Sequence, residues 1–474
     1  MNTVFGFVIL YLLVTIAIGI YAATRVKNAG DFAVAGRSLP LYVVIATVFA
    51  TWFGSETVLG IPATFLEDGL GGIIEDPFGA SMCLVLVGLF FARKLYRMNL
   101  LTIGDYYRQR YGRTIEVVVS ICIVLSYLGW VAAQITALGL VFNVLSQGEI
   151  STSQGMLIGA SIVILYTILG GMWSVALTDL FQMIIIVLGL LYLVWRVSDL
   201  AGGADAVIAH AAANNMFDFA PAFTTADILA FVAAWVTMMF GSIPQQDVFQ
   251  RVMSAKSANV GATGSVIGGL LYLAFAFLPI FLAYSAQLID PKMVASLMEE
   301  DTQMILPSLV LNQAPVFGQV VFFGALLSAI MSTASGTLLA PSLTLTRNLI
   351  GEIVSMSDRQ LLMMTRIVVV LFGVAVTAFA LAMEGTSIYE MVSNAYKVPL
   401  VGAFVPLVMG LYWSRATTQG AFLSTFGGLA SWALLEAFAA DGMWPPQLVG
   451  LLVSFGGMLA GSLMPQFVRR AAAA

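Results

Sequence analysis

Long uninterrupted stretches of apolar residues most limit what this chain can fold into. A helix needs about 20 apolar residues to cross roughly 30 Å of hydrocarbon. About thirteen such stretches are present, and no segment between them is long enough for a soluble domain. This pattern predicts an all-α polytopic membrane protein with about 13 transmembrane helices, embedded in the lipid bilayer. The predicted spans are residues 3–22, 40–65, 77–96, 115–146, 154–170, 173–196, 227–246, 259–286, 314–346, 361–383, 389–413, 417–437 and 446–467.

Composition narrows the classes of function. Charged residues make up 9% of the chain, against about 25% in typical soluble domains. The single histidine, His210, falls in a predicted outer loop, which argues against a histidine metal cluster or a Ser-His-Asp triad. The sequence also has no glycine-rich phosphate loop for ATP. We therefore expect a protein that is not an enzyme, has no nucleic-acid partner and draws its energy from an ion gradient.

The basic residues predict the orientation in the membrane, because Lys and Arg gather on the cytoplasmic side. With the N-terminus outside, all of the 20 basic residues except Arg196, Lys292 and Lys397 fall on that side. They include Arg469 and Arg470 after the last span. The first span lacks the flanks of a cleavable signal peptide. We expect a multi-pass protein of a bacterial-type inner (plasma) membrane, with the N-terminus outside and the C-terminus in the cytoplasm.

Two predicted spans are interrupted by glycine, proline and polar side chains. The second is broken around Gly54 and Pro62, and the seventh around Gly241 and Pro244. Because every backbone group must be paired inside hydrocarbon, each interruption suggests a discontinuous helix. The alternative is one kinked helix and one helix that simply ends at Pro244.

The spacing of these interruptions predicts the domain organisation. The two interrupted spans start five spans apart, as expected for two inverted structural repeats with a substrate site between their first members. No sequence repeat is visible, so this expectation rests on spacing alone. We expect one transmembrane domain over residues 1–474, with an extra N-terminal span at 3–22, a first repeat at 40–196, a second at 227–413 and two C-terminal spans within 417–467.

The ninth span carries a dense run of small hydroxyl residues between Ser328 and Thr337. Such residues can simply let helices pack closely. They can equally supply hard oxygen ligands to an alkali cation, completed by carbonyls that a break near Gly54 would free. The two features together favour a sodium site between the second and ninth spans.

Two carboxylates are predicted at membrane depth, Glu56 in the second span and Asp179 near the start of the sixth. Ionisable groups at this depth usually face a cavity, a partner or an ion path. Asp179 can instead be a favourable helix-start residue near the cytoplasmic face. Glu56 can bind a cationic part of a substrate, take up a proton or hydrogen-bond to a neighbouring span.

Three motifs resemble those of the sodium/solute symporter family. Residues 31–39 (DFAVAGRSL) resemble the segment that leads into its first core helix. Residues 170–179 (GGMWSVALTD) resemble its GG-x-x-A-V-x-x-T-D segment, with Ser174 in place of the alanine, and residues 249–251 (FQR) its Gln-Arg motif. The resemblance covers most of the chain. It implies the LeuT-type fold with an extra N-terminal span, and sodium-coupled secondary active symport of a small organic solute by alternating access.

The resemblance also implies a sodium site made of three carbonyls and two hydroxyls. A possible second cation site, present in some members of the family, would use the carboxylate of Asp179 and the hydroxyl of Ser335. It would be incomplete, because Gly336 has no hydroxyl to offer. The implied sodium-binding residues are Ala50, Phe53, Ala329, Ser332 and Thr333.

Within the family, the sequence is most similar to the high-affinity choline transporter branch. The similar stretches are residues 50–54, 88–93 and 304–307. Trp52 and Trp130 resemble two aromatic residues of a cage that holds a quaternary ammonium by cation–π attraction. Gln245 and Ala80 stand where that branch has a tryptophan and a tyrosine, so choline itself is not inferred.

The expected substrate site combines two tryptophans, one carboxylate and three glutamines. Glu56 favours a cationic or zwitterionic solute, such as an amine or an amino acid. Ordinary packing of the tryptophans and interhelical hydrogen bonds of the glutamines are the alternatives. The predicted substrate-binding residues are Trp52, Glu56, Trp130, Gln134, Gln245 and Gln246.

Two other functions fit a chain of this kind. A transporter-like solute sensor would be favoured by a fused signalling domain, but only a few residues follow the last predicted span. A sodium-linked channel would conduct ions without a solute. The sequence favours the symporter, and it leaves the solute, the sodium stoichiometry and the oligomeric state open.

Overall fold

The computed structural model describes residues 3–351, 353–440 and 442–468. In these ranges the chain is almost entirely helical, and its one β contact is an isolated parallel bridge between Leu39 and Ala255. Arg469 and Arg470, which the sequence places in the cytoplasm, lie outside the described residues. The predicted all-α fold is confirmed.

The first half of the chain contains α1 to α9 and four short π- or 3₁₀-helical turns. Their bounds are α1 Thr3–Ala23, α2 Ala29–Val34, η1 Ala35–Arg37, α3 Leu41–Trp52, η2 Glu56–Gly60, α4 Ile61–Gly72, η3 Ile74–Gly79, α5 Ala80–Leu86, η4 Val87–Phe91, α6 Ala92–Arg97, α7 Ile103–Tyr111, α8 Arg113–Leu145 and α9 Thr152–Leu200.

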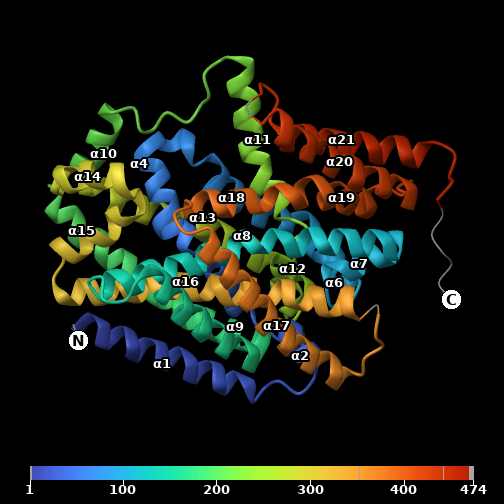
Figure 1. Ribbon diagram of the computed structural model, residues 1–474, viewed down its shortest axis with the longest axis horizontal. Coiled ribbons are helices and arrows are strands. Elements are labelled where there is room, and N and C mark those ends of the chain that lie inside the picture. The colour runs from blue at the N-terminus through green and yellow to red at the C-terminus, as the bar shows by residue number, and fades with distance from the viewer. Residues whose placement is uncertain (1–2, 352, 441, 469–474) are drawn as a thin grey trace.

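The second half contains α10 to α21. Their bounds, with the short turns between them, are α10 Ala204–Ala213, α11 Thr225–Gly241, α12 Gln246–Ser254, α13 Ala258–Ile289, α14 Pro291–Glu300, η5 Thr302–Met304, α15 Ile305–Gln313, α16 Val316–Thr344, η6 Leu345–Ile350, α17 Asp358–Ala382, α18 Ile388–Pro399, η7 Leu400–Phe404, α19 Val405–Tyr412, α20 Thr418–Phe438 and α21 Pro446–Leu463. Figure 1 shows α1 along the lower edge of the bundle, α16 across its middle, and α20 beside α21 at the upper right.

The described residues form ten helices long and apolar enough to cross a membrane, or twelve if each of two bent pairs is one span. The predicted number of 13 stays a prediction. The difference lies in α9, whose 49 residues span about 74 Å at 1.5 Å per residue, more than twice the hydrocarbon thickness. The sequence predicts two spans here, and α9 bends between them at Gly171, which has φ +51° and ψ −136°.

The chain bends at both predicted interruptions. The axis turns by 56° between α3 and the helix over Glu56–Gly72, and by 45° between α11 and α12. Phe53 leaves the helical conformation with φ −89° and ψ 71°, and Gln245 is extended with φ −73° and ψ 143°. Both bends lie inside the bundle, where the residues around them are buried. The backbone groups that they free must therefore find partners within the protein.

Glycines let α13 approach the broken helix α3 closely. A Cβ atom on Gly264 would lie 2.5 Å from Val44 Cγ1, and one on Gly268 would lie 2.6 Å from Val48 Cγ1. Small residues at such contacts allow helices to pack tightly in a membrane, where no water drives their association. The half of the bend that contains α3 is thereby held by a continuous neighbouring helix.

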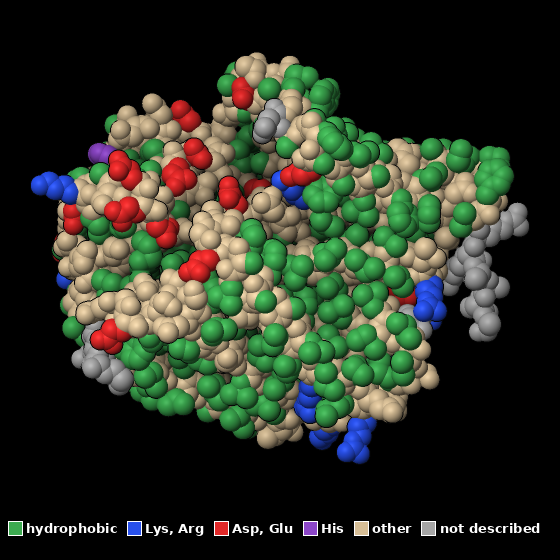
Figure 2. All heavy atoms as spheres, in the orientation of Figure 1, with side chains coloured by type: hydrophobic (Ala, Val, Ile, Leu, Met, Phe, Trp, Pro, Cys, Tyr) green, Lys and Arg blue, Asp and Glu red, His purple; other side chains and the backbone are tan. Residues whose placement is uncertain are grey.

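Charged side chains gather at opposite ends of the face seen in Figure 2. Most of its Asp and Glu side chains lie toward the left, around α10 and α14, and most of its Lys and Arg side chains lie toward the right and lower edges. The apolar side chains lie chiefly between them. This distribution fits a bundle whose ends face two aqueous compartments.

Replacing Gly171 with alanine tests the bend in α9. An added Cβ would lie 2.5 Å from the carbonyl oxygen of Phe32 and would force a side chain into a positive-φ conformation. We expect Gly171→Ala to lower the free energy of unfolding by about 1–3 kcal/mol, measured as a lower melting temperature in detergent. The control is Gly456→Ala in α21, where no atom lies within 4 Å of the added Cβ. Equal melting temperatures for the two variants would contradict a bend of α9 that requires glycine at position 171.

Candidate functional site

The break after α3 is closed by side chains of α8. The amide of Ser55 donates to Gln134 Oε1 at 2.9 Å, and Gln134 Nε2 donates to Glu56 Oε2 at 2.7 Å. Trp130 Nε1 donates to the other carboxylate oxygen of Glu56 at 3.1 Å. Trp130 and Gln134 can act together because residues four apart share one face of a helix. Glu56 thus joins two other predicted substrate residues, Trp130 and Gln134.

Trp130 also belongs to a group of four neighbouring aromatic residues, which we call the aromatic cluster: Trp52, Trp130, Tyr272 and Tyr396. Ring centroids lie 5.6 Å apart for Trp52 and Trp130, 6.2 Å for Trp52 and Tyr396, 5.6 Å for Trp130 and Tyr396, and 6.5 Å for Trp52 and Tyr272. All four residues are at most 3% exposed. The rings contact each other directly, so this structure holds the cluster closed.

The two predicted glutamines of the second break differ in their surroundings. Gln245 faces α8, where its Nε2 donates to Ser126 Oγ at 2.8 Å and its Oε1 has no hydrogen-bond partner. Gln246 Oε1 instead accepts from the amide of Ile103, at the start of α7, at 2.8 Å. Gln246 therefore serves a helix N-terminus, and its hydrogen bond does not lead to the aromatic cluster.

The predicted sodium region lies where α16 meets the end of α3. Thr333 Oγ1 donates to the carbonyl oxygen of Thr51 at 2.8 Å and lies 3.5 Å from that of Ala50. A Cβ atom on Gly54 would lie 2.7 Å from Thr333 Oγ1, so the break and α16 touch here. Ala329, Ser332 and Thr333 share the same buried stretch of α16. Carbonyl and hydroxyl oxygens at a broken helix are the donors that suit an alkali cation.

Asp179 is fully buried beside this region. Its Oδ1 accepts from Ser332 Oγ at 2.6 Å, and its Oδ2 has no hydrogen-bond partner. The Ser335 hydroxyl donates to the carbonyl of Ser332 in its own helix at 3.0 Å. The structure thus brings Asp179 to Ser332, whereas Ser335 is occupied within α16.

A buried arginine that was not among the predicted site residues connects the two broken helices. Arg251 of α12 is 1% exposed, and its Nη2 donates to Thr51 Oγ1 at 2.7 Å. A Cβ atom on Gly336 would lie 2.2 Å from the same nitrogen. Gly336 thereby makes room for the guanidinium. In the sequence, the feature that could have indicated a buried side chain here is Gly336, which interrupts the hydroxyl run of the ninth span.

Two tyrosines of the aromatic cluster and a carboxylate were also not predicted. The Tyr272 hydroxyl donates to Asp76 Oδ1 and lies 3.3 Å from Thr57 Oγ1. The Tyr396 hydroxyl is buried without a hydrogen-bond partner. Thr57 in turn donates to the carbonyl of Trp52 at 3.2 Å, which pairs another group freed by the break.

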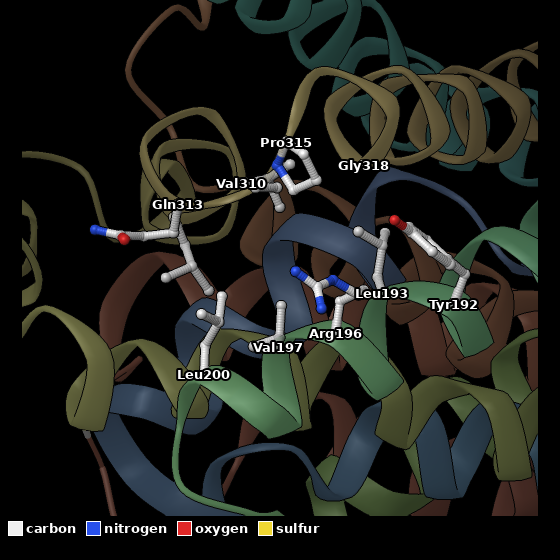
Figure 3. A pocket seen from close by; sticks show the side chains of 11 residues that line it. Tyr192, Leu193, Arg196, Val197, Leu200, Val310, Gln313, Pro315 and Gly318 are labelled. Carbon is white, nitrogen blue, oxygen red and sulfur yellow. The ribbon is translucent and has the colours of Figure 1, made fainter.

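A separate small cavity lies between α9, α15 and the start of α16 (Figure 3). It encloses about 10 Å³, and most of its wall is apolar, including Leu193, Val197 and Val310. A space of this size holds about one water molecule, so it does not suit an organic solute. This cavity is therefore not a second candidate site.

Solved structures share this fold. A Na⁺-coupled sialic acid symporter in a substrate-bound outward-open state superposes with a TM-score of 0.84 at 17% identity, over 99% of each chain. A nucleobase-cation-symport-1 family transporter in a closed conformation gives a TM-score of 0.60 at 14% identity, over 90% of this chain and 93% of that one. These likenesses confirm the LeuT-type fold of membrane transporters.

Sequence relatives narrow the class further. The chain is 29% identical to the Homo sapiens high affinity choline transporter 1 over 444 residues, which are 89% of this chain and 75% of the relative. It is 25% identical to the sodium/proline symporter of Haemophilus influenzae over 464 residues, which are 92% and 88% of the two chains. The sequence model of the Sodium:solute symporter family matches residues 32–428. The chain belongs to the sodium:solute symporter family.

Membership of this family confirms several predictions made from the sequence. The protein is a multi-pass membrane transporter and not an enzyme. It carries out sodium-coupled symport of a small solute, and sodium is its coupling ion.

Proposed function

We propose that the solute carries a positively charged amino group, as a cation or a zwitterion, and binds at the aromatic cluster beside Glu56. The observation that carries this proposal is a buried carboxylate that accepts from the indole N–H of Trp130, a member of the aromatic cluster. Glu56 is 2% exposed and accepts from Trp130 and Gln134. Its two oxygens retain lone pairs for an ammonium group. The ring faces of Trp52 and Tyr396 add cation–π attraction.

The glutamines have different roles in this proposal. Gln134 orients Glu56 and pairs the freed amide of Ser55, so it positions the carboxylate. Gln245 Oε1 is a buried acceptor without a partner, and it can accept from a donor on the solute. Gln246 contributes through the position of α7 and not through direct contact.

We propose a sodium site formed by the carbonyls of Ala50, Phe53 and Ala329 and the hydroxyls of Ser332 and Thr333. In the structure the Thr333 hydroxyl donates its proton to a carbonyl of α3. A sodium ion at this place would turn the same oxygens into ligands and hold the end of α3 against α16. The donor set fits an alkali cation, because all five donors are hard oxygens.

Sodium and solute then bind with positive coupling. Sodium orders the break that begins at Phe53, and Glu56 lies three residues further along the same break. A ligand shifts a conformational equilibrium by its differential affinity for the two states, so each ligand favours the state that the other needs.

Alternating access would move the two repeats, residues 40–196 and 227–413, around this site. One net positive charge moving inward gains about 2.3 kcal/mol per 100 mV.

We propose that a single sodium ion is transported. A second cation at Asp179 and Ser335 would need a further hydroxyl at position 336, where Gly336 instead accommodates Arg251. Asp179 also interacts electrostatically with this guanidinium. A resident positive charge thus stands beside the possible second cation site.

We propose a bacterial-type inner (plasma) membrane, with the N-terminus outside and the C-terminus in the cytoplasm. The distribution of basic residues along the sequence supports this orientation. The opposite gathering of acidic and basic side chains in Figure 2 is consistent with it.

Alanine variants of the two hydroxyl ligands test the sodium site. We expect Ser332→Ala and Thr333→Ala each to raise the sodium concentration for half-maximal transport by about tenfold or more, because each removes one oxygen ligand. The matched control is Thr337→Ala, one turn further along α16, whose hydroxyl donates to a carbonyl of its own helix at 2.7 Å. Unchanged sodium dependence in both ligand variants would refute the site.

Replacement of Glu56 by glutamine tests the charge of the solute. Glu56→Gln keeps the size of the side chain but removes the negative charge, so transport of an amine or amino acid should fall by about tenfold or more. Uptake into proteoliposomes under a sodium gradient measures the effect. Glu149→Gln, in the loop between α8 and α9, is the control for loss of a carboxylate elsewhere. Full transport by Glu56→Gln would remove the argument for a charged solute.

A further inference from the structure

More carboxylates are buried in this protein than one sodium ion and one positive charge on the solute can balance. Among the described residues that are buried, there are six acidic side chains and one basic side chain, that of Arg251. The acidic residues are Glu56, Glu75, Asp76, Glu116, Asp179 and Asp247. Buried charges of this kind are costly unless they are paired.

Three of the six have an evident partner. Glu116 lies 3.7 Å from Arg108. Arg251 is the buried base beside Asp247, because its Nη1 donates to the backbone carbonyl of that residue at 3.2 Å, and its positive charge also acts on the carboxyl group of Asp179. Arg251 offsets one of these two negative charges, and a sodium ion at the neighbouring site offsets the other. Glu56, Glu75 and Asp76 are left without a buried base.

The basic group that acts on Glu75 is already engaged. Lys397 interacts electrostatically with Glu75, but its ammonium lies 3.4 Å from the carboxylate of Glu436. Its side chain is 20% exposed, so it stands at the edge of the buried region. Lys397 therefore leaves most of the negative charge of these three carboxylates uncompensated.

The uncompensated carboxylates form two poles joined by one tyrosine. Glu56 is one pole, beside the aromatic cluster. The Tyr272 hydroxyl donates to Asp76 at the other pole and lies 3.3 Å from Thr57, the residue after Glu56. The ring of Tyr272 is also part of the wall of the aromatic cluster, 6.5 Å from Trp52. The side chain of Tyr272 therefore reaches from the aromatic cluster to Asp76.

The second pole has a free acceptor. Glu75 is 7% exposed, its Oε2 accepts from Ser393 at 2.7 Å, and its Oε1 has no hydrogen-bond partner. A metal ion does not account for this pole. In the part of the chain that the structure describes, no group of three or more His, Cys, Asp or Glu residues could hold one. Separated carboxylates of this kind suit separate ammonium groups on one molecule.

We propose that the transported solute is a dication, an aliphatic diamine or polyamine, with one ammonium at Glu56 and a second at Asp76 and Glu75. This inference rests on the proposed function, because it extends the same site. The methylene chain between the two charges would lie along the rings of Tyr272 and Trp52. Sodium and a dication together reduce the buried negative charge by three.

Ligand-induced thermal stability of the purified full-length protein tests the proposal. The probes are putrescine, cadaverine and spermidine, with butylamine as the matched monoamine and proline as a zwitterion, each in sodium and in potassium. Ligand linkage raises stability by RT ln(1 + [L]/Kd), so the shifts give relative affinities. We expect a diamine or spermidine to stabilise in sodium with an affinity at least about tenfold above that of butylamine.

Two other outcomes distinguish failure of the dication proposal from failure of the proposed function. Sodium-dependent stabilisation by butylamine or proline that no diamine exceeds would overturn the dication and leave the proposed function standing. A protein that neither sodium nor any probe stabilises would contradict both.

Variants of the second pole provide an independent measurement. Asp76→Asn and Glu75→Gln should lower the affinity for the preferred diamine by about tenfold or more, and leave that for butylamine unchanged. Glu390→Gln is the matched control, because it removes an exposed carboxylate from α18, the helix that carries Ser393. Equal losses for both probes, or no loss for either, would overturn the second pole, including the case in which Asp76 and Glu75 simply carry protons. The two variants check each other if one fails to fold.

Discussion

The pairing of backbone groups at a broken helix inside the membrane is the constraint on which the rest of this structure depends. The bend after α3 frees amides and carbonyls where no water is available to bind them. Side chains supply three of the partners that these groups find. Gln134 accepts from the Ser55 amide, Thr57 donates to the carbonyl of Trp52, and Thr333 donates to that of Thr51. The residues that close the break are therefore also those that line the candidate site.

The same contacts explain how sodium and solute can act on one element. The Thr333 contact comes from α16 and the Gln134 contact from α8, and both end on the segment between Thr51 and Glu56. Arg251 connects the second broken helix to the same segment, because it donates to Thr51 from α12. A ligand that reorganises this short segment changes contacts to three helices at once. Coupling between sites needs such a shared element with two arrangements.

Much of this arrangement could be predicted from the sequence, because its signals are local. Glycine and proline mark both breaks, and the hydroxyl run marks the face of α16 that meets α3. The spacing of Trp130 and Gln134 places them on one face of α8. The number of spans does not follow from these local signals, since α9 continues through Gly171 with a bend where the sequence predicts two spans.

Other parts of the site could not be predicted, because they depend on contacts between distant segments. Tyr272 and Asp76 are 196 residues apart, and Arg251 and Thr51 are 200 residues apart. A tyrosine or an arginine in an apolar span gives no sign of which partner it will meet. Tyr396 joins the aromatic cluster in the same way, through packing of α18 on α8. The hydrogen bond of Gln246 could not be predicted for a related reason, since its partner is the amide of Ile103 at the start of α7.

Hydrogen–deuterium exchange of the segment from Phe53 to Thr57 tests the central claim most directly, because that claim places sodium at the break of α3. The purified protein would be compared in sodium and in potassium at equal ionic strength. Slower exchange of this segment in sodium, with little change in α20 and α21, is the result expected if sodium holds α3 against α16. Identical exchange of the segment in the two salts would contradict the account.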